Sequence, residues 1–276
     1  MIGKEISHYR ITERIGAGGM GTVYKADDLT LKRIVAVKVV KATNIDPTLS
    51  TSRFLHEAKA VSKINHPNVV TLLDIEQQGA SNYLIMEYVD GPSLRALLAD
   101  GPIESKRVLE ITRDIARGLG AAHALGVIHR DIKPENVVLD AEGRAKILDF
   151  GVAHLVDQTS KTRRGSLIGT LPYMSPQQIQ AKPVDLRADV YALGVLLYEM
   201  LTCKLPFDGK EEEALIFQIL NLTPPRLEET ITGLPAGLQE ILTTAMAKKP
   251  DERYPSMVDM VHDIDVILAQ LGSGKP

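Results

Sequence analysis

The chain changes character at Asp90-Gly91-Pro92, and this change constrains its fold more than any other feature of the sequence. Five segments before it are rich in β-branched and aromatic residues and predict strands, at 9–15, 21–26, 34–40, 69–75 and 83–88. One predicted helix, 51–64, interrupts them. A strand-rich front joined to a helix-rich back predicts an α+β chain with two lobes and a ligand-binding cleft between them.

The helical half of the chain is predicted from apolar periodicity. Val108, Ile111, Ile115 and Leu119 recur at helical spacing and predict an amphipathic helix. Residues 189–201 are apolar nearly all round, which predicts a helix at the centre of a core. Further helices are predicted at 211–220, 237–247 and 256–271. We therefore expect an N-lobe over 1–88, a C-lobe over 89–271 and a short tail over 272–276.

Composition excludes several classes of protein. The chain is 44% hydrophobic and 24% charged with a net charge of -3, which gives no general attraction to nucleic acid or anionic membranes. Its polar start predicts no signal peptide, and its most apolar segment is too short to cross a bilayer. We expect a cytoplasmic protein, or the cytoplasmic domain of a longer membrane protein. The single cysteine, Cys203, excludes an internal disulfide, and we expect it to be packed inside.

A glycine-rich string, G-x-G-x-x-G, occupies Gly16 to Gly21. A dinucleotide-binding fingerprint leads from a strand into a helix, whereas strand-like sequence lies on both sides of this string. The pattern favours a glycine-rich hairpin whose backbone amides can lie close over phosphate groups. A plain hairpin turn is the alternative.

Lys38 is the one charge within the apolar strand at 34–40. It could lie on the solvent face of an edge strand. A buried ammonium group needs a partner, however, and the predicted helix that follows offers Glu57. A lysine held by that carboxylate could neutralise the phosphates of a nucleotide.

The string from His129 to Asn136 carries the strongest signal, because six of its residues match H-R-D-x-K-P-x-N. Asp149-Phe150-Gly151 follows it after a short interval. Together with the glycine string and Lys38, these motifs make the chain resemble a eukaryotic-type (Hanks-type) serine/threonine protein kinase catalytic domain over about 9–271. The strings G-G-M-G-x-V-Y-K at 18–25 and G-T-x-x-Y-M-S-P at 169–176 make it most like the bacterial members. The resemblance implies the bilobal protein kinase fold and an enzyme that uses ATP and Mg²⁺, with Mn²⁺ as an alternative ion.

The resemblance also implies the role of each catalytic residue. Asp131 would take the proton of the substrate hydroxyl or orient it, and Lys133 would contact the transferring phosphate. Asn136 and Asp149 are hard oxygen ligands that suit magnesium. Thr170 would bond the catalytic aspartate and lysine.

The nucleotide would lie between the glycine-rich hairpin, apolar walls and the backbone of the hinge, residues 87–89, with Met86 at the back of the pocket. The nucleotide-binding residues that the resemblance implies are Ile15, Gly16, Ala17, Gly18, Gly19, Met20, Gly21, Val23, Ala36, Lys38, Glu57, Glu87, Val89 and Val138.

The same resemblance implies protein substrates with serine or threonine acceptors, because Lys133 follows Asp131 by two residues and Gly169-Thr170 precedes 172–176. A second copy of the chain is a further expected substrate. Arg130 predicts control by a phosphate on the activation segment, 149–177. The candidate acceptors there are Thr159, Ser160, Thr162 and Ser166, of which Thr162 is favoured by position.

One residue departs from the family pattern. Gln177 replaces the glutamate that normally pairs with a buried arginine, here Arg253, so we expect the activation segment to be anchored less strongly. The substitution Gln177→Glu should then raise the melting temperature modestly. The alternative function is a nucleotide-binding pseudokinase or scaffold. It predicts a lost catalytic residue, yet the set is complete: Lys38, Glu57, Asp131, Asn136 and Asp149.

Overall fold

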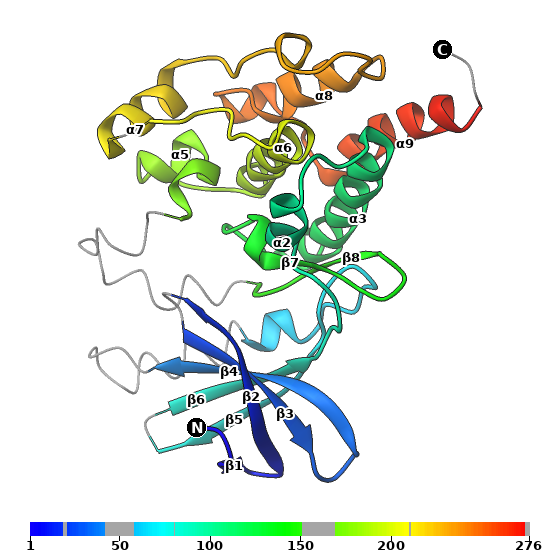
Figure 1. Cartoon of the computed structure of the whole chain (residues 1–276). Coiled ribbons are helices and arrows are strands. Elements are labelled where there is room, and N and C mark those ends of the chain that lie inside the picture. The colour runs from blue at the N-terminus through cyan, green and yellow to red at the C-terminus, as the bar shows by residue number, and fades with distance from the viewer. Residues whose placement is uncertain (19–20, 42–57, 80, 151–168, 210, 274–276) are drawn as a thin grey trace.

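The computed structural model describes residues 1–18, 21–41, 58–79, 81–150, 169–209 and 211–273. Strands gather in the N-terminal lobe and helices in the C-terminal lobe (Figure 1). This confirms the predicted α+β, bilobal fold. In the described part of the chain, no helix combines the length and the apolar character needed to cross a membrane.

The N-terminal lobe is built on an antiparallel sheet with strand order β1-β2-β3-β4-β6-β5. Its strands are β1 (Glu5–Ile6), β2 (Tyr9–Gly18), β3 (Gly21–Asp28), β4 (Arg33–Lys41), β5 (Leu72–Gln78) and β6 (Ser81–Glu87). Successive side chains of β4 point to opposite faces of the sheet. Val35 and Val37 pack with Tyr83 and Ile85 of β6 on one face, which leaves Lys38 on the opposite face.

The strand predictions hold for β2, β3, β4 and β6, with small differences at their ends. The strand predicted at 69–75 begins only at Leu72, because Val69 forms a parallel bridge with Ile147 of the C-terminal lobe. The predicted strand segment therefore contacts the C-terminal lobe through Val69 and joins the N-terminal sheet only from Leu72 onward. Of the helix predicted at 51–64, residues 51–57 lie outside the described residues, and 58–61 are helical.

Within the residues that the structure describes, the C-terminal lobe contains helices and one short hairpin. The helices are α2 (Leu94–Ala99), α3 (Ser105–His123), α5 (Pro176–Ile179), α6 (Arg187–Thr202), α7 (Glu212–Asn221), α8 (Leu238–Ala245) and α9 (Met257–Gly272), and the hairpin is β7 (Val137–Leu139) with β8 (Ala145–Ile147). The five longer helices confirm the predictions. The short elements α2, α5, β7 and β8 were missed, because segments of three to six residues carry too little periodicity to recognise.

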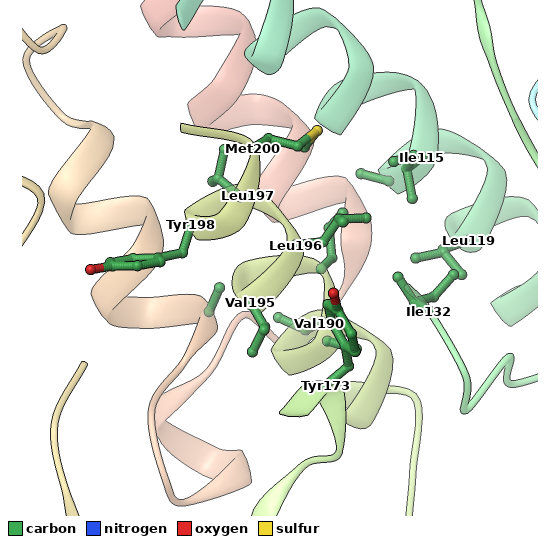
Figure 2. Close-up of a cluster of buried hydrophobic side chains, with 14 of the residues drawn as sticks. Ile115, Leu119, Ile132, Tyr173, Val190, Val195, Leu196, Leu197, Tyr198 and Met200 are labelled. Carbon is green, nitrogen blue, oxygen red and sulfur yellow. The ribbon is translucent and has the colours of Figure 1, made fainter. Parts of the chain in front are cut away.

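Helix α6 forms the centre of the C-terminal core, as its uniformly apolar sequence predicts. Every residue from Ala188 to Leu201 is buried. In Figure 2, Ile115 and Leu119 of α3 lie on the same side of α6 as Ile132, which follows Asp131 directly. This packing attaches the segment 129–136 to the buried core of the lobe. The expectation for Cys203 is wrong, because this residue is exposed at the C-cap of α6 with a φ of 54°.

Candidate active site

The segment 129–136 is held by a buried carboxylate. Asp189, in the first turn of α6, is fully buried and accepts hydrogen bonds from the backbone N–H groups of His129 (2.8 Å) and Arg130 (2.7 Å). Its Oδ2 also lies 2.8 Å from His123 Nε2. Arg130 adopts a left-handed φ of 67°, which is unfavourable for a side chain other than glycine. The bonds to Asp189 therefore fix a strained turn immediately before Asp131.

His129 supports this loop from a buried position. Its Nδ1 accepts the backbone N–H of Asp131 at 3.2 Å, so the proton is on Nε2, which lies 2.8 Å from the Leu148 carbonyl oxygen. Its ring packs edge-on against Phe150 at a centroid distance of 4.7 Å. Both ring nitrogens are occupied and the side chain is buried. His129 is therefore a packing residue, as predicted.

Three predicted catalytic residues form one hydrogen-bonded cluster. Lys133 Nζ lies 2.9 Å from both carboxylate oxygens of Asp131 and 2.7 Å from Thr170 Oγ1. Thr170 Oγ1 in turn donates to Asp131 Oδ1 at 3.1 Å. Thr170 is 37 residues from Lys133 in sequence. The predicted contact of Thr170 with the aspartate and the lysine is therefore confirmed.

Asn136 and Asp149 carry oxygen atoms that could bind a divalent cation. Asn136 Nδ2 donates to the backbone oxygen of Asp131 (2.7 Å) and to its Oδ2 (3.0 Å), so the amide oxygen is the atom that would meet a cation. The backbone N–H of Leu148 donates to the Asn136 carbonyl oxygen at 2.8 Å, which joins the segments that carry the two ligand candidates. Neutral and anionic oxygens of this kind fit Mg²⁺.

Lys38 lies at the inner face of β4 with only 3% of its surface exposed, which excludes a solvent-facing lysine. Its ammonium group lies 2.9 Å from Asp149 Oδ2. The predicted partner Glu57 lies outside the described residues. The lysine and the candidate metal ligand are therefore adjacent, and both could reach the phosphates of one nucleotide.

The glycine string forms a strand-to-strand hairpin, in which Gly16 pairs with Val23 and Gly18 with Gly21. Gly21 has a φ of 145°, and a Cβ atom there would lie 2.2 Å from the carbonyl oxygen of Val39. Only glycine fits this position. Gly19 and Met20 lie outside the described residues. The strand β3 follows the string where a dinucleotide-binding fingerprint would have a helix, so that alternative is excluded for topological reasons.

The predicted adenine walls come from both lobes. Ala36 pairs with Met86 across β4 and β6 and is buried, whereas Val23 and Val138 are half-buried, as is Val89 of the predicted hinge. Ile15 of β2 is 43% exposed. A small cavity behind Met86 is lined by Ala58, Val61, Val70, Leu72, Leu84, Met86, Asp149 and Phe150.

The side chain of Glu87 is bonded within the protein. Its carboxylate binds Lys146 Nζ at 2.7 Å and accepts the backbone N–H of Thr71 at 3.3 Å. The side chain thereby ties the end of β6 to β8 of the C-terminal lobe.

A polar network centred on Arg95 of α2 was not predicted from the sequence. The guanidinium group binds Glu199 of α6 (2.7 Å), the hydroxyl of Tyr173 (2.8 Å) and Glu135 of the catalytic loop, the segment 129–136 (2.8 Å). The Tyr173 hydroxyl donates to Glu199 at 2.5 Å, and burial, followed by this carboxylate, raises the pKa of Tyr173. The available signal was Glu199 itself, the one charge in the apolar run from Val190 to Leu201.

Gln177 contacts Arg253, as predicted, but it also makes a bond that glutamate could not make. Arg253 Nη2 donates to Gln177 Oε1 at 2.7 Å, and Gln177 Nε2 donates to the carbonyl oxygen of Lys248 at 3.0 Å. The other bonds of Arg253 go to backbone carbonyls, and burial lowers its pKa to about 10. The amide therefore satisfies both of its neighbours, one as acceptor and one as donor.

This geometry reduces the stability gain that the sequence alone suggests for Gln177→Glu. The new charge would strengthen the bond to Arg253 but would set a carboxylate oxygen against the Lys248 carbonyl. We expect the free energy of unfolding to change by less than about 1 kcal/mol. Gln177→Leu removes both bonds and is expected to cost about 1–3 kcal/mol. Urea denaturation of both variants checks this, and a gain above about 2 kcal/mol for Gln177→Glu would contradict the matched amide.

Comparison with known proteins agrees with this site. The protein kinase domain model matches residues 9–263. The serine/threonine-protein kinase PrkC of Bacillus subtilis is 36% identical over 266 residues, which are 96% of this chain and 41% of PrkC. PknL of Mycobacterium bovis is 37% identical over 266 residues, covering 96% of this chain and 67% of PknL. The probable serine/threonine-protein kinase PknB of Lactococcus lactis is 34% identical over 258 residues, which are 93% of this chain and 41% of PknB.

The chain thus spans between 41% and 67% of the length of these curated relatives. All three are named as serine/threonine kinases and come from bacteria, as the resemblance implied. They support a kinase over the pseudokinase alternative. The family match over most of the chain, the bilobal fold and the assembled catalytic loop show that this chain belongs to the protein kinase family, as a serine/threonine kinase domain of the bacterial type.

Proposed function

We propose that the protein containing this domain transfers the γ-phosphoryl group of ATP to serine and threonine hydroxyls of other proteins. The observation that carries the proposal is the cluster of Asp131, Lys133 and Thr170, in which every contact lies between 2.7 and 3.1 Å. A cluster of this kind sets one carboxylate in a defined orientation beside a fixed positive charge. Phosphoryl transfer depends mainly on such positioning and charge stabilisation.

In the proposed reaction, Asp131 accepts or orients the proton of the substrate hydroxyl, whose oxygen forms the new bond to phosphorus as the bond to ADP breaks. Lys133 stabilises negative charge on the transferring group, and Lys38 does so on the remaining phosphates. Asn136 and Asp149 would hold Mg²⁺, which neutralises charge on the phosphate oxygens when bound. Mn²⁺ is the alternative ion, because it accepts the same oxygen ligands.

The nucleotide-binding assignments and the lobe boundaries belong to the same proposal. The hairpin glycines would lie over the phosphates, the apolar walls would contact the base, and the hinge backbone at Glu87 and Val89 would bond it. The boundary between 88 and 89 falls just after β6, in a segment without regular structure. Residues 272–276 would form a tail outside the catalytic unit.

The proposed partners are proteins with serine or threonine acceptors, including a second copy of this chain, and no nucleic acid. The net charge of -3 supports the proposal that nucleic acid is not a partner. The proposed location is the cytoplasm, for the chain alone or as part of a longer membrane protein. Phosphoamino-acid analysis of a phosphorylated acceptor tests the substrate class. Phosphoserine or phosphothreonine is the expected product, and phosphotyrosine alone would refute this class.

We also propose that phosphate on the activation segment switches the enzyme on. Arg130 Nε is buried and has no hydrogen-bond partner among the described residues. Because buried polar groups normally have a partner, this atom supports the binding of an anion such as phosphate beside Arg130. The candidate acceptors Thr159, Ser160, Thr162 and Ser166 lie outside the described residues. A phosphate near Arg130 could form one to three strong hydrogen bonds and draw the segment onto the catalytic loop.

Activity is therefore expected to rise after preincubation with ATP and to fall after phosphatase treatment, with Thr162 as the main site. Each form is assayed for its initial rate on the same protein substrate. Thr162→Ala should abolish the rise, whereas Thr243→Ala, at an exposed threonine on α8, is the matched control and should retain it. Equal initial rates before and after preincubation would refute the switch, and a full rise in Thr162→Ala would refute the choice of acceptor.

A further inference from the structure

Gln178, in the short helix α5, contacts two separate parts of the chain. At the start of the helix it completes a capping box: its Oε1 accepts the backbone N–H of Ser175 at 2.9 Å, and Ser175 Oγ accepts the backbone N–H of Gln178 at 3.4 Å. Glutamate fills this position of a capping box as well as glutamine does. Capping alone therefore does not require an amide at position 178.

The amide nitrogen of the same side chain reaches the catalytic loop. Gln178 Nε2 donates to the carbonyl oxygen of Arg130 at 2.9 Å, across 48 residues of sequence. The two contacts use opposite ends of the amide, one as acceptor and one as donor, and together they define its orientation. Only an amide of this length can make both bonds.

The bond from Gln178 acts on the strained residue that precedes Asp131. Arg130 has a φ of 67°, and Asp189 holds its backbone N–H at 2.7 Å. Gln178 holds its carbonyl oxygen, which belongs to the peptide unit that leads directly into Asp131. The two peptide units of Arg130 are thus fixed from two sides, by α6 and by α5.

We propose that Gln178 is a positioning residue for catalysis, which orients the peptide between Arg130 and Asp131 and so the carboxylate of Asp131. The bond also connects α5, at the end of the activation segment, to the catalytic loop. The inference rests on the proposed role of Asp131. It assigns to Gln178 a task separate from helix capping, and the two tasks can be separated by substitution.

Gln178→Glu is the most informative variant, because glutamate keeps the acceptor for Ser175 but replaces the donor to Arg130 with a carboxylate oxygen. We expect kcat to fall about 5- to 50-fold, with the KM for ATP and the melting temperature close to those of the unchanged chain. Gln178→Met removes both bonds and should lower kcat and the melting temperature together. Ser175→Ala weakens only the N-cap of α5 and should lower the melting temperature without lowering kcat.

A kcat of Gln178→Glu within about twofold of the unchanged chain would overturn the proposal. If this variant does not fold, Gln178→Met and Ser175→Ala decide, and equal kcat values for these two would overturn it. Asp131→Asn is measured in parallel. If Asp131→Asn stays active, the proposed mechanism itself fails, whereas an inactive Asp131→Asn beside a fully active Gln178→Glu refutes only the positioning role.

Discussion

Asp131→Asn is expected to lose nearly all phosphoryl transfer while the chain still folds and binds nucleotide. The amide keeps the shape of the carboxylate but can no longer take the substrate proton, and it loses the charge that Lys133 contacts at 2.9 Å. Proton transfer by a positioned side chain contributes about 10²- to 10⁴-fold to rate, and we expect kcat to fall within that range. Steady-state kinetics and nucleotide titration of the purified variant measure the two effects separately.

The matched control for this variant is Asp265→Asn. Asp265 lies on α9, half-exposed, and pairs with Arg113 and Arg117, far in sequence from the catalytic loop. This change removes the same charge and should leave kcat unaltered. Turnover of Asp131→Asn at the level of this control would remove Asp131 from the mechanism.

Thr170→Val is expected to produce the second large loss of activity. The substitution conserves side-chain shape but removes the hydroxyl that accepts from Lys133 at 2.7 Å and donates to Asp131 at 3.1 Å. Two contacts to charged groups disappear together, and we expect kcat to fall about 10- to 100-fold with little change in nucleotide affinity.

Thr170→Ser tests whether the hydroxyl is the cause of this loss. Serine restores the oxygen without the methyl group and should retain most of the activity that valine loses. Circular dichroism melting of both variants shows whether the fold is intact. Comparable activity in Thr170→Val and the unchanged chain would show that the hydroxyl does not contribute.

Much of the fold could be predicted because long segments of the sequence carry a clear period. The helices α3 and α6 and the strands β2, β3 and β4 follow from apolar spacing and β-branched residues. The strands β7 and β8 were missed because three residues do not define a period. The start of β5 was misplaced because Val69 pairs with the other lobe, a tertiary contact that no local pattern reveals.

The catalytic residues could be predicted because they stand within contiguous motifs, but their supporting residues could not. Gln178 and Arg95 each act through contacts that span 40 or more residues of sequence. Neither is unusual as an isolated residue. Gln177 shows the same limit, since the sequence indicates a lost charge, whereas the structure adds the donor bond to Lys248.

The most direct test of the central claim is to incubate the purified chain with ATP and Mg²⁺ and an acceptor protein, and to map new phosphates by mass spectrometry. Lys38→Met is the control, because Lys38 is buried at the cleft beside Asp149 and methionine has a similar size. The account predicts phosphate on serine and threonine with the unchanged chain and almost none with Lys38→Met. Equal phosphate in both samples, or none with a folded and ATP-bound unchanged chain, would contradict it.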